Sequence, residues 1–338
     1  MQNPAMPGSV FTLRSRDFFR HQTENQTNQS AMPKNKTTPR RRMCGACEAH
    51  QRLCECDPGF RERRSLIHMQ AETFMLNGRV ARSRESRKIR TLPVVVHVVY
   101  NTPDENISDA QIRSQIKVLN RDYSAKNPDK TKTPTPWKGL IIDSKIRFAL
   151  AKKDPEGKPT TGITRTKTDA TSFGTHDEVK SGATGGVNAW PTDKYLNLWV
   201  CALGEQLLGY AQFPGGPKAT DGVVILNTAF GTVGTAAVPF NLGRTAVHEV
   251  GHWLNLNHIW GDTNDCSGDD HISDTPKAKL PNFGKPAFPH VTCKNGPNGD
   301  MFVNYMDYVD DAAMVMFTTG QVARMHATLI GPRNAIGV

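Results

Sequence analysis

The chain of 338 residues lacks any run of about 20 apolar residues, which excludes a transmembrane helix. Its longest apolar stretch, residues 93–99, is interrupted by His97 and has the length of a β-strand. The N-terminus also lacks a charged start followed by an apolar segment, so no standard signal peptide is predicted. Hydrophobic residues make up 37% of the chain, enough for a core. The length predicts about two domains, or one large domain with an appendage.

Most of the chain lacks the positive excess that its net charge of +10 suggests. Residues 1–60 carry 9 Lys and Arg against 5 Asp and Glu, residues 61–90 carry 9 against 3, and residues 91–338 carry 24 of each. The excess therefore belongs to an N-terminal segment. A basic arm can bind nucleic acid, but aromatic residues are barely interleaved with these basic ones, and we predict no nucleic-acid partner.

The N-terminal segment differs in composition from the rest. Residues 1–43 are rich in Asn, Gln, Thr, Ser and Pro and are predicted to be disordered. A cysteine-rich patch follows, and then an arginine-rich run that includes a helix-like stretch over residues 65–76. We place a boundary near Phe60, which divides the chain into an N-terminal prosegment, residues 1–60, and a folded domain, residues 61–338.

From Leu92 onward the sequence alternates between strand-like and helix-like segments. Residues 108–111 resemble a capping box, and apolar residues at helical spacing follow them. Loop-forming residues dominate the stretch 261–302. A strand–helix–strand–strand half followed by an irregular half predicts an α+β fold. The expected strands are residues 93–100, 145–151, 195–202, 209–213 and 222–226, and the further expected helices are about residues 244–256 and 319–329.

One segment, HEVGHWLNLNH, carries the pattern of a metal site. His248 and His252 are one helical turn apart, so both imidazoles project from one face and can share a zinc ion. Glu249 stands beside them, placed to hold and deprotonate a metal-bound water. His258 can join only if the helix ends before it. Asn255 is the expected turn, because asparagine tolerates the left-handed conformation.

Ordinary core or surface histidines are the alternative interpretation of this segment. With 11 His in 338 residues and as many Glu, however, the four positions arise by chance only about four times in ten thousand. About 50 residues downstream stands Met306 in the sequence NYMDY, where zinc enzymes with the long histidine motif have a methionine turn. Met306 could be an ordinary core residue, but its order and spacing favour the metal site. The sequence therefore predicts a zinc peptidase.

These motifs resemble those of the metzincins, and within that clan those of the pappalysin family in its ulilysin-like branch. The resemblance rests on residues 248–262, on the Met306 turn with Tyr308 and on a later loop between two cysteines, and it covers about residues 65–338. Other metzincins carry Gly where this chain has Asn255. The ulilysin-like branch tolerates Asn there, so this difference narrows the family without undermining the metal site.

The resemblance implies a metzincin-type zincin fold: a twisted mixed sheet, an active-site helix above the cleft, and an irregular lower half with the methionine turn and a C-terminal helix. It implies endopeptidase activity on protein or peptide substrates, with one zinc ion held by the three histidines and Glu249 as general base. Tyr308 would hydrogen-bond the tetrahedral intermediate. A disulfide between Cys266 and Cys293 is also implied, and with it an oxidising, extracellular location.

Two further sites follow from the same resemblance. Residues 269–275 are dense in oxygen ligands that suit calcium, with Asp270 and Thr275 as the preferred positions, and a solvated acidic turn is the alternative. Asp310 and Asp311 follow the methionine turn, where a carboxylate would select Lys or Arg after the scissile bond. Either aspartate could instead be a surface charge.

The cysteine-rich patch has three interpretations. Cys44, Cys47, Cys54 and Cys56 with His50 could form a zinc knuckle on the basic arm. Alternatively a thiolate, Cys44 in preference to Cys47, ligates the catalytic zinc and displaces its water, since the Cys-Gly after basic residues resembles the cysteine switch of metzincin zymogens. An inert or disulfide-bonded patch is the third interpretation.

We therefore predict a secreted zinc endopeptidase, made as a latent zymogen that its own prosegment inhibits. An enzyme that cuts before Lys or Arg could process itself ahead of Arg61, Arg63 or Arg64. The rival hypothesis is a catalytically silent metzincin-fold binding protein that uses a basic, cysteine-rich zinc-knuckle arm. The intact Glu249 argues against it, because a protein without catalysis needs no base.

Overall fold

The described part of the chain comprises residues 41–76, 88–204 and 206–337 of a computed structural model, all within one unit, residues 40–338. Residues 1–43 are predicted to be disordered, and of these residues 1–40 lie outside the described part of the chain. Arg42, which falls in the same predicted segment, is buried. Among the described residues, no helix is both long enough and apolar enough to cross a lipid bilayer.

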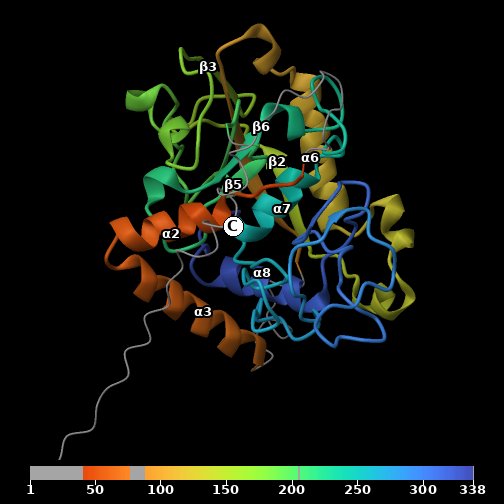
Figure 1. Cartoon of the computed structure of the whole chain (residues 1–338). Coiled ribbons are helices and arrows are strands. Elements are labelled where there is room, and N and C mark those ends of the chain that lie inside the picture. The colour runs from red at the N-terminus through yellow and green to blue at the C-terminus, as the bar shows by residue number, and fades with distance from the viewer. Residues whose placement is uncertain (1–40, 77–87, 205, 338) are drawn as a thin grey trace, which may run out of the picture. The chain divides into compact units, whose positions relative to one another are not determined.

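A six-stranded mixed sheet organises the body of the chain, as predicted (Figure 1). The strand order is β2-β1-β4-β6-β5, and β3 pairs with the C-terminal half of β1. The pairs are parallel except for β5 with β6 at the edge. The strands are β1 (Arg90–Tyr100), β2 (Ile146–Leu150), β3 (Ile163–Lys167), β4 (Leu196–Cys201), β5 (Gly209–Ala211) and β6 (Val223–Leu226).

Strand β1 lies at the centre because its sequence, RTLPVVVHVVY, is apolar and β-branched on both faces. Val94 and Val96 enter the main core, whereas Val99 enters a second core on the other face. The sequence does not predict β3, because ITRTK is only partly buried and has no apolar run. Its pairing with β1, a strand more than 60 residues earlier, decides its conformation.

Two helices cover one face of the sheet. The first is α6 (Asp109–Tyr123), which begins at Ser108, where the side-chain oxygen accepts a hydrogen bond from Gln111 N at 3.2 Å. The second is α7 (Arg244–Trp253), which is buried along its whole length and packs against α6, β5 and β6. This packing holds the HEVGH segment, which α7 contains, beside the edge of the sheet.

Two further helices precede the sheet in the chain. The structure forms α2 (Ala46–Cys56), which the sequence analysis does not predict, and α3 (Phe60–Leu76), of which it predicts the part from residue 65. Helix α2 contacts β5, and α3 lies along the C-terminal helix α8 (Thr319–Ile330) (Figure 1). Helix α3 begins at Phe60, and the domain boundary near this residue stays a prediction.

The chain between α7 and α8 is irregular, as predicted. It contains only the two-residue strands β7 (Phe283–Gly284) and β8 (Tyr308–Val309), which pair in parallel, and the disulfide between Cys266 and Cys293. A capping box formed by Thr318 and Gln321 then starts α8. Short 3-10 helices occur at Pro103–Glu105, Pro128–Lys132, Thr135–Leu140, Glu178–Lys180, Gly182–Thr184, Lys218–Thr220 and Asn227–Ala229.

Candidate active site

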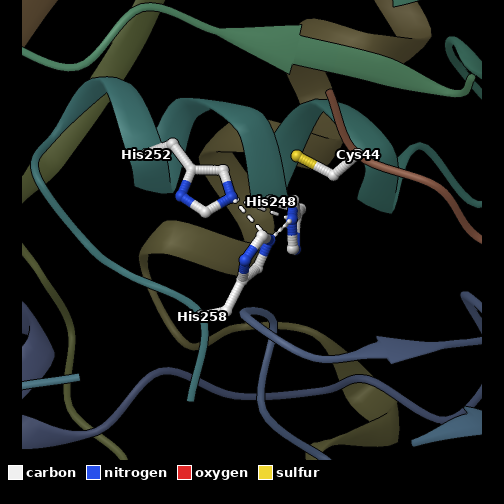
Figure 2. Close-up of side chains that lie close together, drawn as sticks. All are labelled: Cys44, His248, His252 and His258. Carbon is white, nitrogen blue, oxygen red and sulfur yellow. Dashed lines mark hydrogen bonds between the residues drawn. The ribbon is translucent and has the colours of Figure 1, made fainter. Parts of the chain in front are cut away.

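Three buried histidines converge at the end of α7 (Figure 2). His248 and His252 lie one turn apart on the helix, and their Nε2 atoms are 3.1 Å apart. Asn255 has a φ of +74°, the left-handed conformation expected at this turn, and the helix ends before it. His258 Nε2 then lies 3.0 Å from His252 Nε2 and 3.3 Å from His248 Nε2. The left-handed turn therefore brings the third histidine to the other two.

Each of these histidines uses its second ring nitrogen, Nδ1, as a hydrogen-bond donor. That bond leaves a lone pair on Nε2, which faces the other two rings. Burial, and next the neighbouring histidines, hold the pKa of His248 and His252 well below the usual value, so both rings are neutral. The acceptors are Tyr305 O at 2.7 Å from His248, Leu256 O at 2.8 Å from His252 and Asp262 Oδ1 at 2.6 Å from His258.

This donor set fits a zinc ion. Tetrahedral zinc with bonds to nitrogen of about 2.0–2.1 Å places its nitrogen ligands about 3.3 Å apart. The three Nε2 atoms are separated by 3.0–3.3 Å and carry lone pairs that repel each other unless a cation lies between them. Three histidine ligands leave a fourth position open, as catalytic zinc sites require.

Asp262 is a functional residue that the sequence analysis does not single out, although it stands in the quoted motif four residues after His258. A carboxylate that accepts from a metal-bound imidazole orients the ring and raises its basicity. We expect Asp262→Asn to weaken zinc binding by about 10- to 100-fold. Competition with a chelator measures the affinity, with Asp265→Asn in the same exposed loop as the control. Unchanged zinc affinity in the Asp262 variant would contradict this role.

Glu249 lies on α7 next to the first histidine and is buried. Burial raises the pKa of its carboxyl to about 8, against the opposing effects of the Cys44 hydrogen bond and of Arg42. A group with a pKa close to neutral can both take up and give back a proton. The carboxyl group is buried next to the first histidine and accepts a hydrogen bond from the Cys44 thiol.

Cys44 occupies the open side of the histidine cluster. Its sulfur and the ligand nitrogens of His248, His252 and His258 all lie within 4.8 Å of one another, and its thiol donates to Glu249 Oε2 at 3.4 Å (Figure 2). Cys44 and Cys47 are the two candidates for the cysteine switch. The structure places the thiol of Cys44, and not that of Cys47, with all three histidines.

The chain on both sides of Cys44 pairs with the edge of the sheet. Gly45 N donates to Gly209 O at 2.9 Å, and Leu208 N donates to Met43 O at 3.0 Å. The resulting bridge between Cys44 and Gly209 is parallel. The segment therefore takes the place at the free edge of β5 where an extended peptide would add as another strand.

Asp311, and not Asp310, lies in a buried ion pair. Arg42 donates from Nη2 to Asp311 Oδ1 at 2.6 Å, and both side chains are no more than 1% exposed. The other carboxylate oxygen accepts from Leu242 N and Arg244 N at 2.7 and 3.2 Å. Asp310 is partly exposed. Arg42 is a functional contact that the sequence analysis misses, because its partner is 269 residues away.

Tyr308 and Met306 flank the histidines as the resemblance implies. The Tyr308 hydroxyl donates to the Cys44 carbonyl at 3.4 Å, and its ring meets that of His258 edge-on with centroids 4.9 Å apart. Met306 lies beneath α7: a methyl group added at Gly251 would come within 2.5 Å of its sulfur. The methionine thus packs against the helix turn between the first two histidines.

The cysteine-rich patch does not form the zinc knuckle. Among the described residues, Cys44 groups with the three histidines, whereas Cys47 lies 3.6 Å from His258 Nδ1. Cys54 contacts His50 Nε2 at 3.6 Å, and Cys56 is exposed. The donor atoms therefore point to different places and share no metal position.

A second cluster of ligand-type residues, His68, Glu72 and His271, lies between α3 and the loop after α7. Arg324 donates to His68 Nδ1 at 2.5 Å, so the proton of this ring is on Nε2, which lies 3.0 Å from Glu72 Oε1. The lone pair that a metal would need is thus already used. Hydrogen bonds account for this cluster.

The chain matches the family Peptidase_M43, described as pregnancy-associated plasma protein-A, over residues 184–330. An extracellular metalloprotease of Pyricularia oryzae is 32% identical to it over 291 residues, which cover 83% of this chain and 86% of that protein. Extracellular metalloprotease 1 of Coccidioides posadasii is 30% identical over 270 residues, covering 75% and 84%.

Solved structures give the same result at higher identity. Promirolysin from Tannerella forsythia is 45% identical, with a TM-score of 0.80, over 88% of this chain and 97% of that one. Mature mirolysin from the same organism, in complex with a cleaved peptide, is 51% identical, with a TM-score of 0.73, over 74% and 96%.

Sequence motifs, fold and relatives therefore agree. The metzincin-type α+β fold is confirmed, and so is metalloendopeptidase as the class of activity. A zinc-binding site of three histidines is the expected centre of such an enzyme. The chain belongs to Peptidase_M43, the pappalysin family of zinc metalloproteases.

Proposed function

We propose that the chain is the latent precursor of an extracellular endopeptidase in which His248, His252 and His258 bind the catalytic zinc and Glu249 is the general base. The observation that carries this proposal is the thiol of Cys44 at the open side of the histidine cluster, in contact with Glu249. The names of the curated relatives and the disulfide of the irregular half support an extracellular location.

The chemistry follows from the positions of two side chains. When bound, zinc would lower the pKa of a water molecule and polarise the scissile carbonyl. Glu249 would take the proton from this water and deliver it to the leaving amine. Tyr308, which donates to the Cys44 carbonyl in the latent form, is placed to donate to the oxyanion of the substrate instead.

Cleavage before Lys or Arg is the specificity that Asp311 supports. In the latent form this buried carboxylate binds the guanidinium of Arg42, two residues before Cys44. A basic side chain of the substrate would replace Arg42 and neutralise the same carboxylate. Arginine also matches a carboxylate with its fork of N–H donors, which makes the pair selective.

Latency rests on three contacts of the segment around Cys44. Its thiol takes the position of the catalytic water, Arg42 fills the pocket of Asp311, and the backbone of residues 43–45 occupies the edge of β5. The thiol thus excludes the water, and the other two contacts occupy places that a peptide substrate needs. The prosegment is therefore an intramolecular inhibitor in this proposal.

For maturation we propose a cut after α3 and not near residue 60. Arg61, Arg63 and Arg64 lie in the first turns of α3, and Arg64 Nη1 donates to Asn255 Oδ1 at 2.7 Å. Peptide bonds in a packed helix are not extended, whereas recognition along a sheet edge requires an extended chain. Helix α3 would have to unwind before the earlier positions could be cut.

The comparisons support the later cut. Promirolysin matches 88% of this chain and mature mirolysin 74%. The difference, 14% of 338 residues, is 47 residues, which equals the length of residues 41–87. Residues 77–87 lie outside the described residues, and their sequence, NGRVARSRESR, contains four arginines.

Zinc-loaded full-length protein is expected to convert itself to a form whose first residue is one of the basic residues between α3 and β1. N-terminal sequencing identifies it among Arg79, Arg82, Arg84, Arg87 and Lys88. Replacing these five by Gln should keep the protein at full length.

As the matched control, a variant with Gln at Arg61 and Arg63 should mature normally. A mature N-terminus at Arg61, Arg63 or Arg64 would overturn the later cut and support the boundary near residue 60.

We also propose a structural calcium ion at Asp270 and Thr275. The Thr275 hydroxyl lies 2.8 and 2.9 Å from the two Asp270 oxygens and 2.8 Å from the Ile272 carbonyl, so three kinds of oxygen converge. Such oxygens are the ligands that calcium prefers. Burial raises the pKa of Asp270 to about 7, against the hydrogen bonds from Thr275 and Ile272 and the charge of Arg324.

Calcium at about 100 times its dissociation constant should stabilise the fold by about 2.7 kcal/mol. The rise in Tm should be larger at pH 8 than at pH 6, because a proton competes with calcium for Asp270 below its pKa of about 7. Asp270→Asn should remove the response, whereas Asp269→Asn, an exposed neighbour, should keep it. An equal rise in Tm in both variants would rule out this site.

The rival hypothesis of a non-catalytic binding protein is not favoured. Its zinc knuckle is not formed by the described cysteines, and Glu249 is present and accepts a hydrogen bond from Cys44, the thiol that lies with the three histidines. The similarity to mature mirolysin with a cleaved peptide also favours peptide hydrolysis.

A further inference from the structure

Cys44 has a second thiol close to it that latency itself does not use. Cys47 follows it in the sequence Cys-Gly-Ala-Cys, the C-x-x-C spacing of dithiol–disulfide motifs. Both thiols are free in the structure and both are partly buried. They stand at the start of α2, on the segment that blocks the active site.

The backbone between the two cysteines is already bent as a disulfide needs. Gly45 has φ −87° and ψ 8°, and Ala46 is the first residue of α2. Two such residues in succession close a turn, which brings the Cα atoms of its first and fourth residues within about 7 Å. A disulfide spans Cα distances of about 4.4–6.8 Å. Cys44 and Cys47 can therefore be joined without rebuilding the helix.

The two sulfurs lie near different nitrogen atoms of the histidine cluster. The Cys44 sulfur lies with the Nε2 atoms of the histidine cluster, and the Cys47 sulfur lies 3.6 Å from His258 Nδ1, beside Asp262. A disulfide sulfur has neither the proton that Cys44 donates to Glu249 nor the negative charge of a thiolate ligand. Joining the two sulfurs thus removes the contact that keeps the water away.

We propose that Cys44 and Cys47 form a redox switch, in which their oxidation to a disulfide by a small-molecule disulfide such as oxidised glutathione releases the active site and starts maturation. The proposal rests on the cysteine switch proposed above. It adds a chemical trigger that precedes proteolysis.

The reaction balances as thiol–disulfide exchange. The thiolate of one cysteine attacks the oxidant, forms a mixed disulfide and expels one glutathione thiolate. The second cysteine attacks the protein sulfur of this bond and expels the other. Two electrons pass from the protein to the oxidant, one S–S bond replaces another, and the two thiol protons end on two molecules of glutathione.

The rest of the molecule is compatible with such a trigger. Its irregular half contains the disulfide between Cys266 and Cys293, which requires an oxidising environment. In a reducing compartment Cys44 stays a thiol and the enzyme stays latent, whereas export exposes the pair to oxidant. The nearby Cys54 contacts His50, and this different environment makes it a suitable control.

Formation of the disulfide and activation of the enzyme can be measured separately. Zinc-loaded full-length protein carrying Glu249→Ala, which cannot process itself, is treated with oxidised glutathione, alkylated and mapped by mass spectrometry. The expected product is a peptide that contains a disulfide between Cys44 and Cys47 and has lost two hydrogen atoms. A chain in which both cysteines are alkylated, or in which Cys44 pairs with another cysteine, would overturn the proposal.

The second measurement is the rate of self-processing of the active full-length chain. Oxidised glutathione should accelerate it at least tenfold in wild type and in Cys54→Ser. Cys47→Ser should process itself at the rate that wild type shows without oxidant, and oxidised glutathione should not accelerate it, because the partner thiol is missing. Equal acceleration in Cys47→Ser would overturn the redox switch. Cys44→Ala should process rapidly without oxidant. If it stays latent, the cysteine switch of the proposed function fails instead, which separates the two outcomes.

Discussion

Glu249→Ala is expected to bind one zinc ion per chain and to hydrolyse peptides about 10²–10⁴-fold more slowly than wild type. The three histidines that hold the metal are separate from the carboxylate that moves the proton, so the substitution removes the base and leaves the ligands. The same variant should remain at full length when incubated alone. Metal analysis and peptide hydrolysis, each on the same preparation, measure the two effects.

Glu249→Gln provides the matched control for this result, since it keeps the volume of the side chain but cannot accept the proton. It should lose activity as the alanine variant does. Glu48→Ala, on the first turn of α2, should retain both zinc and activity after maturation. Hydrolysis at near wild-type rates by either Glu249 variant would refute the proposed mechanism.

Asp311→Asn is expected to remove the preference for Lys or Arg after the scissile bond. In the full-length protein the substitution leaves Arg42 buried without its partner, and breaking a buried ion pair costs about 3–5 kcal/mol. If a basic substrate residue uses the same carboxylate, kcat/KM for basic peptides should fall by about 10²–10⁴-fold relative to neutral ones, since each factor of ten corresponds to about 1.4 kcal/mol.

A peptide library compared between wild type and variant measures this change. Asp310→Asn is the control, because this neighbouring carboxylate is more exposed and does not pair with Arg42. A switch of preference caused by Asp310→Asn would assign the pocket to that residue. A wild-type preference for hydrophobic residues after the scissile bond would exclude the proposed specificity altogether.

Two adjacent aspartates, Asp310 and Asp311, illustrate what local sequence cannot distinguish. Asp310 and Asp311 have the same side chain and follow Met306 by four and five residues, and the sequence motif does not say which of them faces the site. The structure distinguishes them because Arg42 reaches only one of them. Helix α2 likewise escapes prediction, since its sequence is polar and cysteine-rich and its buried side packs against β5, a strand about 150 residues later.

Features that depend on residues close together in the chain are predictable from the sequence. Helical spacing puts His248 and His252 on one face, and the left-handed preference of asparagine at Asn255 ends the helix so that His258 can join them.

The sequence motif also proposed Cys44 as a partner of this centre, but the contacts of Arg42 with Asp311 and of the backbone around Cys44 with β5 are found only in the folded chain. The reason is the distance along the chain over which each kind of interaction acts. Backbone preferences act over a few residues, whereas the contacts that make the enzyme latent join positions more than 150 residues apart, and they form only when the sheet and α7 bring those positions together.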